Sequence, residues 1–383
     1  MQVYLDNSAT TKIDKRVLKK MRPYFEDKYG NASSIHFMGQ ENNIKIARCK
    51  KEISKILKGM ADNIIFTSSA TEANNLIIKG VMRANRGKGN HFLISAIEHP
   101  CVLSSGRELL DEGFTFDYIS VDERGILDLK DLKKKIKPET VLISVMAVNN
   151  EIGTIQPIEE IGKIAKEKGI YFHADAVQAV PYLKINIKKW GVDFLSLSAH
   201  KFYGPQGMGL AYVNRDIKIK PIIVGGGQED GLRAGTYNMA GIVGMTEALK
   251  LAYSERSEYV KKVKSLRDYF WKEVAKKIKN IRLNGDLKNR VENNLNIMFE
   301  GVEGEAILID LSVAGICVST GSACSAQNLK VSSVITAIGI DPRYMNSNVR
   351  FTWGRYNNKK EVDYVINKLV KTVERLRKFS VIK

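Results

Sequence analysis

Between residues 63 and 213 the chain alternates between short apolar runs and longer amphipathic stretches. The apolar runs are typical of buried strands, and they lie at 64–67, 91–95, 115–120, 140–147, 170–174, 192–197 and 209–213. Patterns with helical spacing lie between most of them, at 71–85, 100–112, 128–136 and 157–168. This alternation predicts an α/β fold in which helices cover both faces of a mostly parallel sheet.

Different patterns flank this region. The chain opens on a strand-like stretch, and helices are expected at 14–28, 38–58, 236–256 and 257–279. Strand and helix patterns then alternate again, at 294–299, 305–314, 317–319, 332–339, 348–352 and 359–377. We therefore expect a large domain over residues 13–258 and a smaller α/β domain formed by residues 1–12 and 259–383.

The net charge of +18 has two explanations. A basic surface can bind nucleic acid. However, the lysines lie mostly in helical stretches such as 131–137 and 259–279, mixed with acidic residues, which is typical of a solvated helix face. No basic run is interleaved with aromatic residues, as single-strand binding would need, so we expect no direct contact with nucleic acid.

Neither a membrane partner nor a metal site is predicted. No apolar run approaches the ~20 residues that a membrane helix needs, and no charged and apolar leader precedes the first strand. The four cysteines show neither zinc-ligand spacing nor a disulfide pattern; they are Cys49, Cys101, Cys317 and Cys324. Free thiols without an export signal predict a cytoplasmic protein.

Polar residues follow five of the predicted strands. They are Ser68 to Glu72, Glu98 and His99, Asn149 to Glu151, Asp175 with Gln178, and Ser198 with His200 and Lys201. The carboxyl ends of parallel strands meet at one edge of a sheet, where ligands bind. The sequence therefore predicts an active-site cleft at this edge.

Three of these residues have both a chemical and a structural explanation. Lys201 precedes a Gly-Pro stop, where its amine either extends to water or loses its proton and attacks a carbonyl to form a Schiff base. Asp175 either pairs with a protonated ring nitrogen or forms a helix cap or a buried salt bridge. His99 either stacks on a ring and transfers protons or bonds to backbone at a helix start.

A cofactor with a phosphate, an aldehyde and a ring nitrogen would account for the whole set. Asn150 and Gln178 could contact its ring hydroxyl. Thr71, Ser198 and His200 could hold the phosphate, assisted by a helix N-terminus, although small hydroxyl residues at that position are otherwise caps.

Two residues in the C-terminal region are further candidates. Arg350 could bind a substrate carboxylate through two parallel hydrogen bonds, or it forms a surface ion pair. Cys324 lies among small residues in the stretch 319–326, with nothing apolar to bury its thiol, so it is the candidate for a reactive thiolate. Cys317 lies in an apolar pattern and is expected to be a buried, structural thiol.

A series of ordered motifs gives the chain a specific resemblance. They are YLDNSATT, YGNASSIH, FTSSATEANN, AIEHPCVL, VNNEIGTIQP, HADAVQAV, SLSAHKFYGPQG, GGGQEDGLRAGT, LNIMFEGVEGE, STGSACSAQ and VRFTWGRYN. In these the chain resembles, almost from end to end, the NifS/IscS-like cysteine desulfurases. These belong to the class V aminotransferases and have the aspartate aminotransferase-like fold of fold-type I pyridoxal phosphate enzymes.

The resemblance implies a role for each matched residue. Lys201 bonds the pyridoxal 5'-phosphate, Asp175 pairs with the ring nitrogen, His99 stacks on the ring, and Asn150 and Gln178 contact the ring oxygen. Thr71, Ser198 and His200 bind the phosphate, Ala70 also belongs to the cofactor site, and Thr236 reaches the phosphate of a neighbouring subunit in a homodimer. Asn31 and Arg350 hold the carboxylate of the L-cysteine substrate. Cys324, on a loop at about 321–331, attacks the sulfur, so that alanine and a persulfide form.

The sulfur acceptor implied by the resemblance is an iron–sulfur scaffold protein or a protein of tRNA thiolation. The chain departs from the family pattern at Ala32, Ser69, Asp230 and Ala234, none of which is assigned to chemistry. Three alternatives stay open: a selenocysteine lyase, a class V aminotransferase, which would not need Cys324, and a catalytically silent sulfur carrier, which would not need Lys201.

Overall fold

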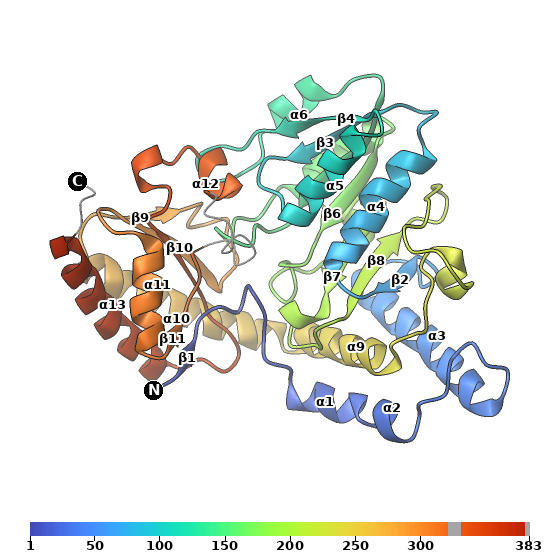
Figure 1. Cartoon of the computed structure of the whole chain (residues 1–383), viewed down its shortest axis with the longest axis horizontal. Helices are drawn as coiled ribbons and strands as arrows, with labels where there is room; N and C mark the ends of the chain where they lie inside the picture. Colours follow the sequence, from blue (N-terminus) through green and yellow to red (C-terminus); the bar gives the residue numbers. More distant parts are fainter. Residues whose placement is uncertain (321–330, 380–383) are drawn as a thin grey trace.

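The structure is a computed structural model, and it describes residues 1–320 and 331–379. The larger lobe is built around one seven-stranded sheet (Figure 1). In spatial order its strands are β2 (Ile64–Thr67), β8 (Gly209–Val213), β7 (Phe194–Ser198), β6 (Tyr171–Asp175), β5 (Thr140–Met146), β3 (His91–Ser95) and β4 (Thr115–Ile119). All seven follow the strands expected from the sequence to within about two residues.

The strand directions place the functional edge. Strands β4, β3, β5, β6 and β7 are parallel to one another. Strand β8 is antiparallel to both β7 and β2, so β2 points the same way as the parallel strands. The carboxyl ends of β2, β3, β5, β6 and β7 therefore share one edge, as the sequence predicts.

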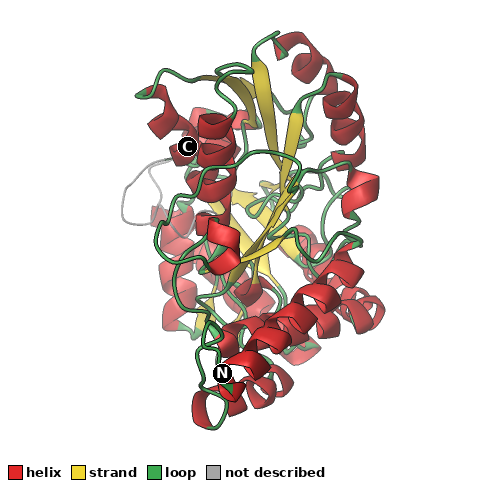
Figure 2. Ribbon diagram, turned by 90° about the vertical axis from the view of Figure 1, so that its right-hand side faces the viewer, coloured by secondary structure: helices red, strands yellow, loops and turns green. Residues whose placement is uncertain are grey.

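Alternating side chains bury both faces of this sheet. Phe92 and Phe194 belong to one apolar cluster, together with residues of α4 (Ala70–Ala84) and α5 (Pro100–Leu110). Leu93 and Leu195, their sequence neighbours, point to the opposite face and join a second cluster. Residues of α6 (Leu129–Lys135), α7 (Ile158–Glu167) and α8 (Ile187–Trp190) belong to that second cluster. Because successive side chains of a strand point to opposite faces, the continuous apolar runs in the sequence produce this two-sided burial, with helices on both sides of the strands (Figure 2).

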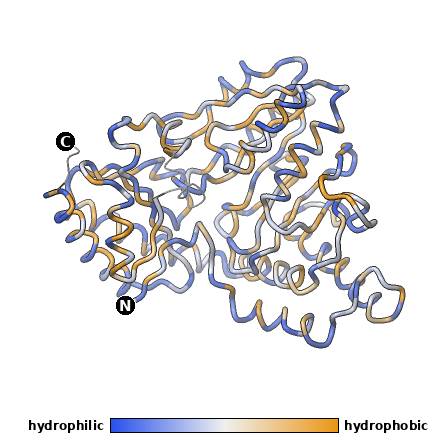
Figure 3. The backbone as a smooth tube through the Cα atoms, in the orientation of Figure 1, coloured by the Kyte–Doolittle hydropathy of each residue, from blue (hydrophilic) through white to orange (hydrophobic). Residues whose placement is uncertain are grey.

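Amphipathic helices complete the larger lobe, and their alternation of polar and apolar residues is visible along the backbone (Figure 3). They are α1 (Lys15–Met21), α2 (Pro23–Glu26) and α3 (Phe37–Leu57). Helix α9 (Met239–Ser254) is buried along most of its length and packs against α1 and α3, and α10 (Arg256–Lys277) follows it and packs mainly against the smaller lobe. The single helix expected at 14–28 is two helices, because Pro23 has no N–H to continue the first one and begins the second.

The smaller lobe has an antiparallel sheet in the order β12 (Asn348–Thr352), β10 (Asn294–Phe299) and β9 (Ile281–Asn284). The helices of this lobe are α11 (Gly304–Val313), α12 (Ser333–Ala337) and α13 (Lys359–Phe379). A short parallel pair, β1 (Val3–Tyr4) and β11 (Ile316–Cys317), joins the N-terminal segment to this lobe (Figure 1).

One expectation for this lobe is wrong. Cys317 is exposed, because Ile316 is the residue of β11 that points inward and is buried. No helix within residues 1–320 and 331–379 is long and apolar enough to cross a membrane.

Candidate functional site

A cavity of about 240 Å³ lies at the carboxyl edge of the large sheet. It collects most of the residues that the sequence predicts for the site: Ala70, Thr71, His99, Asn150, Asp175, Gln178, Ser198, His200, Lys201 and Arg350. The residues after β2, β3, β5, β6 and β7 thus meet in one place, and Arg350 joins them from β12 of the smaller lobe.

Lys201 ends a 3-10 turn directly after β7. Its Nζ donates hydrogen bonds to the carbonyl oxygens of Ser8, at 2.6 Å, and Ala9, at 2.8 Å. The amine therefore lines the cavity and is held by the N-terminal segment.

Asp175 ends β6, and its carboxylate is buried. Its Oδ1 accepts a hydrogen bond from the backbone N–H of Val177 at 3.0 Å, and its Oδ2 accepts one from Nδ2 of Asn74 at 2.8 Å. Asn74 lies one turn into α4. Hydrogen bonds to both oxygens fix the orientation of the carboxylate and stabilise its charge.

The two histidines of the cavity both have a low pKa. Burial lowers the pKa of His99, and the nearby Lys201 ammonium lowers it further, while Asp175 opposes the shift. Burial also lowers the pKa of His200 to about 4, again with a contribution from Lys201. The Nδ1 of His200 lies 3.0 Å from Oγ1 of Thr10. Both imidazoles are therefore neutral at physiological pH.

The N-terminus of α4 opens onto the cavity at Ala70 and Thr71. Ser69 is the N-cap of this helix, and its Oγ accepts a hydrogen bond from the N–H of Glu72 at 3.3 Å. The N-terminus of a 15-residue helix carries a partial positive charge. Together with the hydroxyl groups of Thr71 and Ser198, it gives this end of the cavity the properties of an anion site.

Arg350 carries the positive charge at the side of the cavity that faces the smaller lobe. Its Nη2 donates to Oδ1 of Asp6 at 2.6 Å, and its Nη1 donates to the carbonyl oxygen of Asn150 at 2.9 Å. The Arg350 side chain is only 2% exposed and that of Asp6 is 17% exposed. The alternative of a surface ion pair is therefore wrong, because this ion pair is mostly buried.

Two of the predicted site residues that the structure describes lie elsewhere. Asn31 is exposed in the loop before α3, where its Oδ1 accepts a hydrogen bond from the N–H of Ser33 at 2.9 Å. Thr236 lines a separate cavity of about 180 Å³, together with Met208 and Arg233. Cys324 lies outside the described residues, as does most of the loop predicted at 321–331.

Several residues of the site were not predicted. The carbonyl oxygens of Ser8 and Ala9 hold Lys201, and a backbone acceptor has no signature in the side-chain sequence. Asp6 precedes them in the motif LDNSATT, which contains an acid with no assigned role. Asn74 follows Ala70 by four residues, the helical spacing that places both on one face. That spacing is a signal that could have indicated Asn74.

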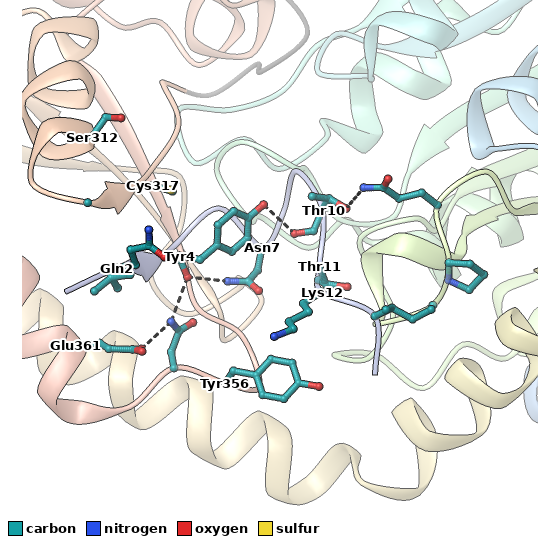
Figure 4. A pocket seen from close by; sticks show the side chains of 17 residues that line it. Gln2, Tyr4, Asn7, Thr10, Thr11, Lys12, Ser312, Cys317, Tyr356 and Glu361 are labelled. Atoms are coloured by element: carbon teal, nitrogen blue, oxygen red, sulfur yellow. Dashed lines mark hydrogen bonds between the residues drawn. The ribbon is translucent and has the colours of Figure 1, made fainter. Parts of the chain in front are cut away.

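The N-terminal segment 4–11 also lines a second and larger cavity of about 1010 Å³ (Figure 4). Tyr4, Asn7 and Thr10 line the second cavity, and the Tyr4 hydroxyl donates to the carbonyl oxygen of Thr10 at 3.1 Å. Ser8 and Ala9 line the first. The segment thus forms a wall of both cavities, and most of the predicted site residues lie in the first cavity. Within residues 1–320 and 331–379, no group of three or more His, Cys, Asp or Glu residues could hold a metal ion.

Comparison with known proteins gives consistent matches. Residues 3–365 match the family model of the class-V aminotransferases. The chain is 47% identical to a cysteine desulfurase IscS of Dictyoglomus turgidum, covering 99% of this chain and 96% of that protein. It is 43% identical to one of Clostridium botulinum, at the same coverage.

Solved structures agree with these sequence matches. A NifS-like protein has a TM-score of 0.92 at 37% identity, covering 98% of this chain and all of the other. A structure described as SspA in complex with cysteine has a TM-score of 0.83 at 34% identity, covering 93% of this chain and all of the other. The chain therefore belongs to the class-V aminotransferase family, among its NifS- and IscS-like members.

Proposed function

We propose that the protein is a cysteine desulfurase that uses pyridoxal 5'-phosphate. It converts L-cysteine to L-alanine and transfers the sulfur to Cys324 as a persulfide. The observation that carries this proposal is the meeting of Lys201, Asp175 and His99 in one cavity. The names of the relatives support it, since several of them are called cysteine desulfurases.

The donor groups of the cavity fit this cofactor. Its ring nitrogen calls for a carboxylate, and Asp175 is a buried carboxylate with a fixed orientation. Its phosphate calls for an anion site, and the N-terminus of α4 with Thr71 and Ser198 supplies one. Its aldehyde calls for an amine, and Lys201 places one in the same cavity. When bound, the cofactor supplies an electron sink for bonds at the amino-acid α-carbon.

The protein's own side chains position the cofactor and the substrate and transfer protons to the substrate. The Asp175 carboxylate would pair with the ring nitrogen, and Asn150 and Gln178 would orient the ring oxygen. Arg350 binds the carboxylate of the substrate, and the Lys201 amine takes up and returns a proton at the substrate's α-carbon.

The thiol of Cys324 completes the reaction. The bond between the β-carbon of L-cysteine and its sulfur breaks, and a bond forms between this sulfur and the Cys324 sulfur. The products are L-alanine and the persulfide, and the proton of the Cys324 thiol balances the equation. A solved relative at 34% identity is described in complex with cysteine, which supports the choice of substrate.

The oligomer and the partner are further parts of the proposal. Large apolar side chains are exposed around α2 and α3, namely Phe25, Tyr29, Ile35 and Phe37. Such a patch marks an interface, and we assign it to a homodimer in which Thr236 reaches the partner subunit's phosphate site. The sulfur acceptor is an iron–sulfur scaffold or a protein of tRNA thiolation in the cytoplasm.

The test measures alanine and sulfide from purified holoenzyme with L-cysteine and a thiol reductant. Wild type should give equal amounts of both products, and Cys324→Ser should give neither. Cys317→Ser is the matched control, because Cys317 is exposed and has no assigned role in the chemistry. Turnover that persists in Cys324→Ser would instead support a lyase or an aminotransferase on this scaffold.

A further inference from the structure

The imidazole of His99 has an unusual environment at one of its two nitrogens. His99 is the N-cap of α5, and its Nδ1 lies 3.2 Å from the backbone nitrogen of Cys101. The same Nδ1 lies 3.0 Å from the Sγ of Cys101. Two groups of one residue therefore meet one ring nitrogen.

The direction of these hydrogen bonds follows from the first contact. A backbone N–H can only donate, so Nδ1 of His99 is an acceptor and carries no proton. The neutral ring must then carry its proton on Nε2. Since Nδ1 is an acceptor, the contact with Sγ is a hydrogen bond in which the thiol of Cys101 is the donor.

We infer that Cys101 is a positioning residue: its backbone N–H sets the tautomer of His99 with the proton on Nε2, and its thiol stabilises that tautomer through a second hydrogen bond to Nδ1. This inference deepens the proposed function and rests on it for the role of His99 in catalysis. The tautomer itself rests only on the geometry of α5.

The surroundings of Cys101 keep its proton in place. Burial, together with the nearby carboxylate of Asp175, raises the pKa of this thiol to about 12. Nδ2 of Asn74 donates a hydrogen bond to Sγ at 3.2 Å. Sγ therefore accepts from Asn74 while its S–H donates to His99. The same Asn74 amide group donates to Asp175, so a single side chain orients both the thiol and the carboxylate.

The consequence concerns what His99 can do in the cavity. A second proton on the ring would have to bind at Nδ1, where it would displace both donors of Cys101. Of the charged groups near the ring, Asp175 raises the pKa of His99 and Lys201 lowers it. His99 therefore has Nε2–H as the hydrogen-bond donor of its neutral ring.

Nuclear magnetic resonance of holoenzyme with ¹⁵N-labelled histidine tests this directly. The two nitrogens of a neutral imidazole have well-separated shifts that report which one carries the proton. The His99 signals are assigned by their loss in His99→Gln. In wild type we expect an unprotonated Nδ1 and a protonated Nε2 throughout the neutral pH range.

Three variants separate the thiol from its surroundings. Cys101→Ala removes one donor to the neutral ring, so the pKa of His99 should rise by about half a unit. Cys101→Ser keeps a hydroxyl donor and should restore the wild-type value. Cys317→Ser is the control and should leave it unchanged. A proton on Nδ1 in wild type, or an unchanged pKa in Cys101→Ala, would overturn the inference.

The readout also distinguishes this inference from the proposed function. If the protein does not desulfurate L-cysteine, the histidine shifts still report the tautomer. If the tautomer is wrong, alanine and sulfide production by wild type is unaffected.

Discussion

Glu98 lies directly before His99, and it is buried. Its Oε1 accepts a hydrogen bond from the N–H of Met146 at 2.5 Å. Among the described residues, Oε2 has no hydrogen-bond partner. Burial, together with the charge of Asp175, raises the pKa of Glu98 well above its ordinary value. The neutral acid is therefore the form that fits the folded protein.

This makes the stability of the protein depend on pH in a defined direction. The unfolded chain releases the Glu98 proton at the ordinary pKa, and the folded chain releases it only at a higher pH. Stability is lost as the pH rises between these two values, at about 1.4 kcal/mol per pH unit. Glu98→Gln should remove this loss, so its advantage over wild type should increase with pH. Urea unfolding between about pH 5 and 8 measures it, and a pH-independent difference would contradict the account.

The ion pair of Asp6 and Arg350 allows a second prediction about a single residue. Replacing Asp6 with Asn removes the carboxylate that pairs with the buried guanidinium of Arg350, and the loss of one partner of a buried pair costs about 3 kcal/mol. Asp230→Asn is the matched control, because Asp230 pairs with Arg215 at 2.9 Å while being 79% exposed. An exposed pair contributes about 1 kcal/mol or less. Equal losses of unfolding free energy in the two variants would rule out the distinction.

At the scale of elements, α12 begins at a cap that also contacts the large sheet's edge. The Oγ of Ser332 accepts from the N–H of Val334 at 3.1 Å and donates to Oε2 of Glu151 at 2.6 Å. Glu151 is buried and follows β5 in the sequence. One hydroxyl group thus stabilises the start of a helix and satisfies a buried carboxyl group from the other lobe.

Removing this hydroxyl should loosen α12. Ser332→Ala should cost about 1–2 kcal/mol, because it removes a helix cap and also a donor to a buried acid. Faster amide hydrogen exchange in α12 would report the loss. Ser333→Ala is the control, because Ser333 is exposed at the next position. If the two variants exchange at the same rate, the cap does not stabilise the helix.

The sequence predicts the elements of this fold best where burial is two-sided. Strands β2, β3 and β8 have the predicted bounds, because a mostly apolar run between turn residues matches a strand that is buried on both faces. Strand β9 was not predicted, since Ile281–Asn284 has polar residues at two of its four positions and lies at an edge. Helix α8 was not predicted because four residues do not establish a helical period.

The site was predicted to a similar extent and for a related reason. Strand ends mark side chains that meet at one edge, so Lys201, Asp175 and His99 could be grouped from their positions alone. Contacts between distant segments have no such marker. Two examples are the ion pair of Asp6 with Arg350 and the hydrogen bonds from Lys201 to two carbonyl oxygens. Both depend on how the N-terminal segment crosses between the lobes.

For the whole molecule, the exposed apolar patch around α3 predicts its assembly. Ile35 is 91% exposed and Phe37 is 73% exposed, and burying such side chains stabilises an interface. Analytical ultracentrifugation of wild type should give the mass of two chains, and Ile35→Asp should shift it toward one. Val313→Asp is the control, because Val313 is 86% exposed on α11 in the other lobe. A wild-type monomer, or a dimer that Ile35→Asp leaves intact, would contradict the assignment.

The wall formed by residues 4–11 has a consequence for the order of events during synthesis. Val3 pairs with Ile316, and Asp6 bonds to Arg350. The ribosome makes residues 3–9 long before it makes their partners. Contacts of such long sequence separation form late, because closing the intervening loop costs entropy. The strands of the large sheet can therefore assemble first. The carbonyl oxygens of Ser8 and Ala9, which accept hydrogen bonds from Lys201, reach their final positions only after the smaller lobe has formed. A growing chain would thus acquire its sheet before its reactive amine is enclosed.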